Sequence, residues 1–167
     1  MNTPPQTYHL REHVDPKDRN KVFRLLNSSG GYFLPREMAY GMDLFDEHLT
    51  RGDASHYRFL LHEQDETLLG YGCYGPIRFS DRRYHLHWMM IHKEMQGRGL
   101  GIMLETAIST KVRGLGGTKI YATVSNRTYQ STKSFYEKCG YKLIANITDL
   151  YGDGDDMVYC MKDLILR

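Results

Sequence analysis

Apolar and polar residues alternate in some stretches of the chain and recur at helical spacing in others, which predicts a mixed α and β fold. Alternating runs bounded by turn residues indicate strands at 7–14, 57–62, 68–74, 84–92, 119–125, 141–150 and 157–161. A polar turn at 64–67 joins the second and third of these strands as a hairpin. No internal repeat or linker interrupts the pattern, so we expect a single domain over residues 1–167.

Four helices are predicted from apolar residues spaced three and four apart. The first begins with Asp15 as N-cap and Pro16 in its first turn and ends at 27–31, and the second begins near Pro35 and ends at 51–53. The third follows the glycines at 97–101, and the fourth runs over 128–139 with Gly140 as its stop. The first helix carries Val22, Phe23, Leu25 and Leu26. One apolar face of the second has Met38, Met42, Phe45 and Leu49, and one stripe of the third has Leu100, Met103, Leu104, Ala107, Ile108, Val112 and Leu115.

Composition and charge exclude several classes of protein. Charged residues make up 25% and hydrophobic residues 41% of the chain, as in ordinary soluble globular proteins. The formal net charge of +2 argues against nucleic acid as a partner, and the densest apolar run, 86–91, is far too short to span a membrane. The three cysteines show no metal-ligand spacing, and the first residues lack a signal-peptide core, so we expect a cytoplasmic location.

A glycine-rich turn precedes the third helix. Residues 95–102 read MQGRGLGI, with three glycines alternating with other residues. A helix N-terminus presents unpaired N–H groups and about half a positive charge, and glycines let an anion approach closely. The pattern predicts a phosphate cradle over Gly97 to Ile102 with Arg98 at its rim; the alternative is a tight turn whose glycines serve packing alone.

The two common nucleotide-binding motifs do not fit this turn. The dinucleotide fingerprint requires a third glycine where Ile102 stands and an acidic residue about 20 positions further on, but 119–125 carries no carboxylate. The P-loop requires Gly-Lys-Ser/Thr after four spacer residues, and that sequence is absent.

Two segments resemble the GNAT superfamily of acetyl-CoA-dependent N-acetyltransferases. Residues 96–101, QGRGLG, match the family's Q/R-x-x-G-x-G/A pattern, and residues 134–141, SFYEKCGY, are similar to its F-Y-x-x-x-G-F/Y segment. The resemblance covers nearly the whole chain. It implies an α/β (α+β) single-domain GNAT fold with a mixed, mostly antiparallel sheet, splayed at the cofactor strand, and helices on both faces. It also implies an acyltransferase that uses acetyl-CoA as cosubstrate and no metal.

The same resemblance implies which residues bind the cosubstrate. Backbone amides of the loop would hold the pyrophosphate of coenzyme A, and the strand before it would pair with the pantetheine arm. The residues concerned are Gln96, Gly97, Arg98, Gly99, Leu100, Gly101 and Ile102 in the loop, and Met89, Met90 and Ile91 in the strand.

Tyr136 matches the family tyrosine that donates a proton to the departing thiolate; the alternative is a helix tyrosine that packs on the sheet. The family often has an asparagine six residues before the phenylalanine of F-Y, where it contacts the cofactor. Tyr129 stands at that position. Ser125, Asn126 and Ser131 are the candidate replacements, and the sequence does not choose among them.

Two histidines precede the cofactor strand residues. In a strand, His85 and His87 share a face with Met89 and Ile91. Two rises of about 3.3 Å separate the imidazoles by roughly 6–7 Å, with room for one bridging water. Because histidine titrates near neutral pH, the pair predicts a relay that carries the acceptor's proton to solvent. The same placement resembles serotonin N-acetyltransferase. The alternatives are merely packed or surface histidines, or a zinc site with His62 as third ligand.

The expected reaction is direct transfer of acetyl from acetyl-CoA to a primary amine of a small molecule or peptide. The N–H of Met90 or a neighbour would stabilise the oxyanion, and Tyr32, Phe33 and Tyr74 would wall the acceptor pocket. The alternative is a non-catalytic acetyl-CoA-binding sensor or interaction module. A homodimer is possible, and neither nucleic acid nor a membrane is an expected partner.

Overall fold

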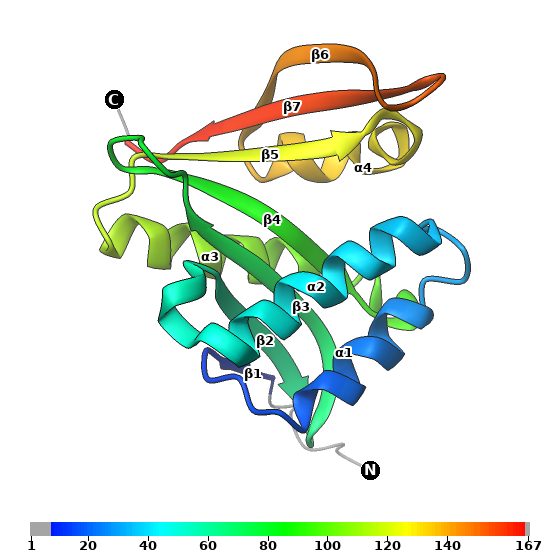
Figure 1. The fold of residues 1–167 in the computed structure, drawn as a ribbon, viewed down its shortest axis with the longest axis vertical. Coiled ribbons are helices and arrows are strands. Elements are labelled where there is room, and N and C mark those ends of the chain that lie inside the picture. Colours follow the sequence, from blue (N-terminus) through cyan, green and yellow to red (C-terminus); the bar gives the residue numbers. More distant parts are fainter. Residues whose placement is uncertain (1–7, 166–167) are drawn as a thin grey trace. The chain divides into compact units, whose positions relative to one another are not determined.

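The computed structural model describes residues 8–165 (Figure 1). Its strands are β1 (His9–Arg11), β2 (Arg58–Gln64), β3 (Thr67–Pro76), β4 (Arg83–Ile91), β5 (Lys119–Ser125), β6 (Tyr141–Gly152) and β7 (Asp155–Asp163). Its helices are α1 (Asp18–Asn27), α2 (Pro35–Arg51), α3 (Leu100–Gly114) and α4 (Asn126–Lys138), with short 3₁₀ helices η1 (Gly52–Ser55) and η2 (Lys93–Met95). The first strand is shorter than predicted, and Thr7 lies outside the described residues.

The strands form a seven-stranded sheet in the order β1-β2-β3-β4-β5-β7-β6. Strand β1 pairs antiparallel with β2, and β7 pairs antiparallel with both β5 and β6. Strands β4 and β5 are parallel, with Arg83–Leu86 opposite Lys119–Ala122. The predicted mixed sheet is therefore confirmed, while its splay at the cofactor strand stays a prediction.

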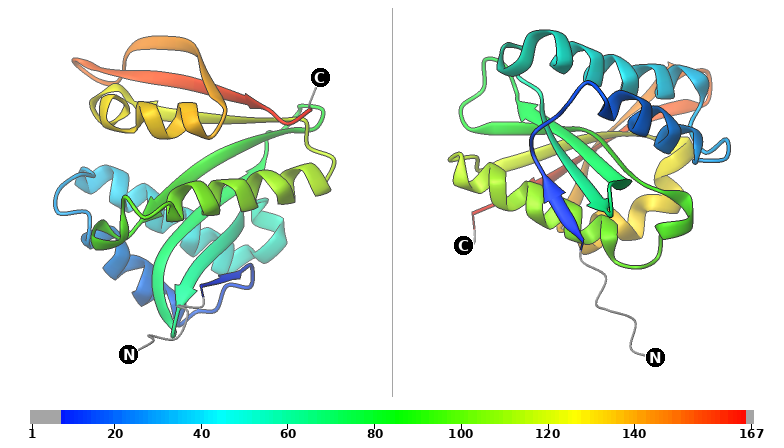
Figure 2. Two further views of the ribbon diagram at one scale, coloured as in Figure 1. Left: turned by 180° about the vertical axis from the view of Figure 1, so that it is seen from behind. Right: turned by 90° about the horizontal axis from the view of Figure 1, so that it is seen from below.

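Contacts between Cα atoms divide the chain into two compact units. Of the described residues, 8–73 and Trp88–Leu104 form the first, and Tyr74–His87 and 105–165 form the second. In the first unit, helices α1 and α2 pack on β2 and β3 (Figures 1 and 2). Its core contains Val22, Leu25, Leu26, Met42, Leu44, Phe45, Phe59, Leu61, Leu68, Tyr71, Cys73 and Met90. Phe23, next to Val22 in the apolar pattern of α1, is 52% exposed.

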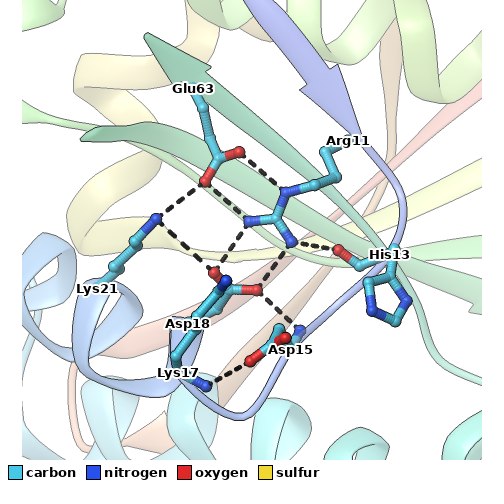
Figure 3. A network of polar contacts seen from close by, with 7 residues as sticks. All are labelled: Arg11, His13, Asp15, Lys17, Asp18, Lys21 and Glu63. Carbon is cyan, nitrogen blue, oxygen red and sulfur yellow. Dashed lines mark hydrogen bonds and ion pairs between the residues drawn. The ribbon is translucent and has the colours of Figure 1, made fainter. Parts of the chain in front are cut away.

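An ion-pair network joins β1, α1 and β2 (Figure 3). The Arg11 guanidinium donates to both carboxylate oxygens of Asp18 and both of Glu63, at 2.8–2.9 Å. The Lys21 ammonium lies 3.4 Å from Glu63. Asp18 also accepts from the N–H of Asp15 at 2.8 Å, which closes the turn before the helix. The prediction that Asp15 caps the helix and Pro16 lies in its first turn is therefore wrong: the regular helix starts at Asp18, with Lys17 as its N-cap, and Asp15 lies in the turn before it.

In the second unit, α4 packs on β5, β6 and β7 (Figure 2). The part of α3 in this unit buries Ile108 and Val112, and Leu104, at the end of the first unit, is buried as well; all three have no exposed surface. Two residues predicted on the same buried stripe are exposed: Met103 by 43% and Leu115 by 47%. Met103 lies one residue, about 100° around the helix, from Leu104, and Leu115 follows the helix end at Gly114.

Candidate acetyl-CoA site and catalytic residues

The glycine-rich loop leads into the N-terminus of α3. Gly97 and Gly99 have φ angles of 76° and 81°, in the left-handed region that favours glycine. A Cβ added to either would meet no atom within 4 Å, so space lies open over this backbone. The N–H of Met103 donates to the carbonyl of Gly99 at 3.0 Å. The helix hydrogen bonding therefore starts at Gly99, and the N–H groups of residues 100–102 have no intrahelical acceptor.

Gln96 fixes this loop to the preceding strand. Its side-chain amide donates to the carbonyl of Ile91, the last residue of β4, at 3.1 Å. Arg98 is exposed, and Leu100 is buried beneath the start of the helix. The loop thus offers backbone donors at the positive end of a helix, no side chain above the two glycines, and a cation at the rim. These features fit the pyrophosphate group of coenzyme A.

The strand before the loop packs closely against β3. Met90 and Ile91 are 5% and 8% exposed, and Met89 is partly buried. A Cβ on Gly70 would lie 2.7 Å from the Met90 carbonyl oxygen and 2.4 Å from Cδ1 of Ile91. Glycine at position 70 is therefore needed for this approach. The contact of Met89, Met90 and Ile91 with the pantetheine arm stays a prediction.

His85 and His87 contact each other directly. Their Nδ1 atoms lie 3.1 Å apart and their ring centroids 4.6 Å apart. The predicted separation of 6–7 Å with a bridging water is therefore wrong, because the side chains turn toward each other from backbone positions that are further apart. Burial lowers the pKa of His85 to about 4, and burial together with the charge of His85 lowers the pKa of His87 to about 3. Both imidazoles are neutral at neutral pH.

Residues 8–165 offer no set of ligands for the alternative zinc site. His62 is fully buried in the first unit, and among the described residues neither of its ring nitrogens has a hydrogen-bond partner. Burial also lowers its pKa. Within residues 8–165, no three or more His, Cys, Asp or Glu side chains form a group that would hold a metal ion.

Tyr136 lies on α4 in a group of aromatic rings. Its ring centroid is 5.3 Å from that of Phe135, 5.5 Å from that of Tyr141 and 6.4 Å from that of Tyr129. Tyr129 itself is only 5% exposed. The structure therefore shows Tyr136 packed between other tyrosines, and its role toward a thiolate stays a prediction.

The three candidates for the missing asparagine contact differ in their hydrogen bonds. The Ser125 hydroxyl donates to Asp155 at 2.5 Å and accepts from the N–H of Arg127, which caps α4. The Ser131 hydroxyl donates to the carbonyl of Thr128 at 2.9 Å. Both hydroxyl protons are thus used within the second unit, whereas Asn126 is the first residue of α4. The contact of any of the three with the cofactor stays a prediction.

The predicted acceptor residues divide into two sets. In the first unit, the rings of Tyr32 and Phe33 lie 5.0 Å apart, and Phe33 contacts Trp88 with ring centroids at 4.8 Å. The sequence interpretation missed Trp88, although it is the only tryptophan of the chain and lies on the candidate cofactor strand. Tyr74, in the second unit, is 1% exposed and presents almost no surface to solvent.

Among the described residues, no helix is both long enough and apolar enough to cross a membrane.

The polar turn between β6 and β7 contains an internal hydrogen bond, in which the Asp149 carboxylate accepts from the N–H of Gly154 at 2.7 Å.

The mixed sheet and the open glycine loop before α3 are features of an acyl-CoA-dependent transferase. A family model described as the acetyltransferase (GNAT) family matches residues 20–141. The chain belongs to this family and is an acetyltransferase that takes its acetyl group from acetyl-CoA. No curated protein matches the chain significantly.

Solved structures agree with this assignment. A protein of Desulfovibrio desulfuricans described as a GNAT-family acetyltransferase is 33% identical, with a TM-score of 0.89, and the match covers 95% of this chain and 100% of that one. An aminoglycoside 6'-N-acetyltransferase in complex with coenzyme A is 16% identical (TM-score 0.76; 95% and 98% covered). The ribosomal-protein-S18-alanine N-acetyltransferase of Escherichia coli is 11% identical (TM-score 0.75; 96% of each chain covered). The last two show likeness of fold alone.

Proposed function

We propose that this acetyltransferase transfers the acetyl group directly to a primary amine of a small molecule or peptide. The observation that carries the proposal is the open, positive-φ backbone of Gly97 and Gly99 at the start of α3. That backbone would hold the pyrophosphate, and the Met89–Ile91 segment of β4 would line the pantetheine arm. The N–H of Met90 or a neighbour would stabilise the oxyanion that forms when the amine attacks the thioester carbon.

The bond changes then assign roles to the titratable groups. A C–N bond forms, the C–S bond breaks, and the departing thiolate accepts a hydrogen bond from the Tyr136 hydroxyl. Tyrosine suits this role because its pKa of about 10 lies only slightly above that of a thiol, about 8.5. The amine's proton leaves through the contact between His85 and His87.

The acceptor side is proposed to use Tyr32 and Phe33, as the sequence predicts, with Trp88 of the same unit added; Tyr74, at 1% exposure, offers an acceptor almost no surface. The contact of Phe33 with Trp88 supports this addition. Aromatic walls suit an aryl amine and a methylene-rich polyamine alike.

We also propose a cytoplasmic location, because all three cysteines are free and buried, as expected in a reducing compartment.

The test is release of free thiol from acetyl-CoA with four acceptors: phenethylamine, spermidine, kanamycin and a peptide with N-terminal alanine. The last two follow the named activities of structural relatives. At least one should release thiol faster than the acceptor-free control, with the acetylated amine confirmed by mass spectrometry. Calorimetry with acetyl-CoA runs in parallel. Tight binding without turnover on any acceptor would contradict catalysis and favour the sensor alternative.

We further propose a homodimer formed through β6, the last strand of the sheet order. Five large apolar side chains on this strand are exposed: Leu143, Ile144, Ile147, Leu150 and Tyr151. An exposed apolar edge strand is typical of an association site. Light scattering should show a dimer that Ile147→Lys dissociates and that Phe23→Lys, at another exposed apolar residue, leaves intact; a wild-type monomer would refute this.

A further inference from the structure

A buried polar cluster in the second unit joins α3, β6 and β7. Glu105 has no exposed surface. One of its carboxylate oxygens accepts from the hydroxyls of Ser109, at 2.7 Å, and Tyr141, at 3.1 Å, while the other accepts from the Lys162 ammonium at 2.8 Å. Lys162 also donates to the Ser109 hydroxyl at 2.9 Å. The buried carboxylate is thus both paired and hydrogen-bonded, as such a charge requires.

The cluster holds the ring of Tyr141 at two points. The hydroxyl donates to Glu105, and the ring centroid lies 5.7 Å from the Lys162 ammonium, within cation–π range. Tyr141 is 3% exposed, and burial together with the Glu105 charge raises the pKa of its hydroxyl well above the ordinary value. The hydroxyl therefore keeps its proton and remains a donor to Glu105.

The ring that is held in this way meets the ring of Tyr136. The two centroids are 5.5 Å apart and the ring planes are 85° apart, a T-shaped arrangement that aromatic pairs prefer. Only four residues separate the two tyrosines along the chain, with the turn at Gly140 between them. Restraint of Tyr141 by residues from α3 and β7 therefore acts on Tyr136 through this ring contact.

We propose that Tyr141, anchored by Glu105 and Lys162, is a positioning residue that aims the Tyr136 hydroxyl at the leaving thiolate. This inference rests on the donor role proposed above for Tyr136. A hydroxyl on a mobile ring loses strength as a donor, because hydrogen bonds weaken steeply with distance and angle. A purely structural cluster would stabilise the fold without changing the state of a bound thiol.

The experiment measures the pKa of the thiol of coenzyme A bound to the protein. Coenzyme A labelled with carbon-13 next to sulfur reports its ionisation by NMR across a pH series. A hydrogen bond from Tyr136 to the thiolate lowers that pKa, so Tyr136→Phe should raise it by about one to two units. Tyr141→Phe, which removes only the anchored hydroxyl, should raise it by roughly half a unit. It should add nothing in the Tyr136→Phe background, because the group it positions is then absent.

Each outcome bears on one of the two proposals. Equal shifts from Tyr141→Phe in both backgrounds, or no shift in the wild-type background, would overturn the positioning role and leave Tyr136 as donor. No shift from Tyr136→Phe would remove the donor role, and the positioning role with it. Tyr159→Phe, a tyrosine on β7 whose ring contacts Tyr121 instead, is the matched control and should change nothing.

The anchor itself is tested by two substitutions at one position. Glu105→Gln keeps an oxygen that accepts from Tyr141, whereas Glu105→Ala removes it. The glutamine variant should therefore shift the thiol pKa less than the alanine variant, and the reverse order would contradict the anchoring. Circular dichroism shows whether each variant is folded. If the alanine variant is not, the Tyr141→Phe comparison decides alone.

Discussion

The burial of His85 and His87 predicts a steep loss of stability in mild acid. Their pKa values, about 4 and about 3, lie below the value of about 6.5 expected in the unfolded chain. The unfolded state therefore binds more protons below about pH 6.5, and the pair's full contribution to stability is present only above that pH. At about pH 5 the linkage relation gives a loss of about 2 kcal/mol for each histidine relative to about pH 8, or about 4 kcal/mol together.

Urea unfolding at about pH 8 and about pH 5 measures this difference. Wild type should lose about 4 kcal/mol more of its free energy of unfolding than the double variant His85→Gln, His87→Gln. His62 is buried in both proteins, so its own acid loss cancels in the comparison. The exposed pair His9 and His13 gives the matched control, His9→Gln with His13→Gln, which should lose as much as wild type. A double variant at 85 and 87 that loses as much stability as wild type would refute the reasoning.

Three further predictions concern the cosubstrate loop, the proposed donor and the buried ion pair. Gly99→Val, at φ 81° with open space above it, should weaken coenzyme A binding in calorimetry, and unchanged affinity of the folded variant would exclude the cradle. Tyr136→Phe should lower kcat by about 10²–10⁴-fold with little change in acetyl-CoA affinity; a kcat near wild type in a chemistry-limited assay would leave it a packing residue. Asp18→Asn should cost roughly 3 kcal/mol of unfolding free energy by removing a buried partner of Arg11, whereas Asp46→Asn, in the exposed pair with Arg19, should cost much less.

The contribution of Asp18 to the free energy of unfolding also depends on pH. Burial alone would raise the pKa of this carboxyl, but hydrogen bonds from Arg11 and from the Asp15 backbone outweigh it, so the pKa is lowered. A lowered carboxyl pKa contributes stability that is present above the unfolded value of about 3.9 and is lost as pH falls toward the folded one. Wild type and Asp18→Asn should therefore converge in stability only in strong acid, below about pH 3.9, whereas the histidine effect already begins below about pH 6.5.

The sequence pattern predicts the helices and strands more accurately than it predicts the side-chain contacts. Strand β5 begins and ends at the predicted residues, Lys119 and Ser125, because its apolar run is short and bounded by turn residues. The predicted separation of the His85 and His87 imidazoles was wrong, because strand geometry fixes the positions of the Cα atoms but not the side-chain rotamers. Met103 was misplaced because neighbouring apolar residues on a helix face different directions, and only the tertiary partner decides which of them is buried.

The buried cluster around Glu105 shows why part of the site escapes sequence reasoning. A glutamate on a helix is usually exposed, and its partners Tyr141 and Lys162 lie 36 and 57 residues away along the chain. Only Ser109, four residues along α3, is a local signal. By contrast, the glycine loop can be recognised in the sequence, because its backbone conformation requires glycine at defined positions.

The histidine contact also constrains how the acceptor's proton can leave. Forming an imidazolium at a site with pKa about 4 costs about 4 kcal/mol at about pH 7, so a charged intermediate on His85 is unfavourable. A neutral pair with Nδ1 atoms 3.1 Å apart offers another route, in which one ring accepts the amine's proton at Nε2 and passes its Nδ1 proton to Nδ1 of the other ring, which releases its own Nε2 proton to solvent. Both rings then remain close to neutral, and no bridging water is required. On this route the pair acts by direct contact, so substitution of either histidine alone should interrupt the transfer as fully as substitution of both.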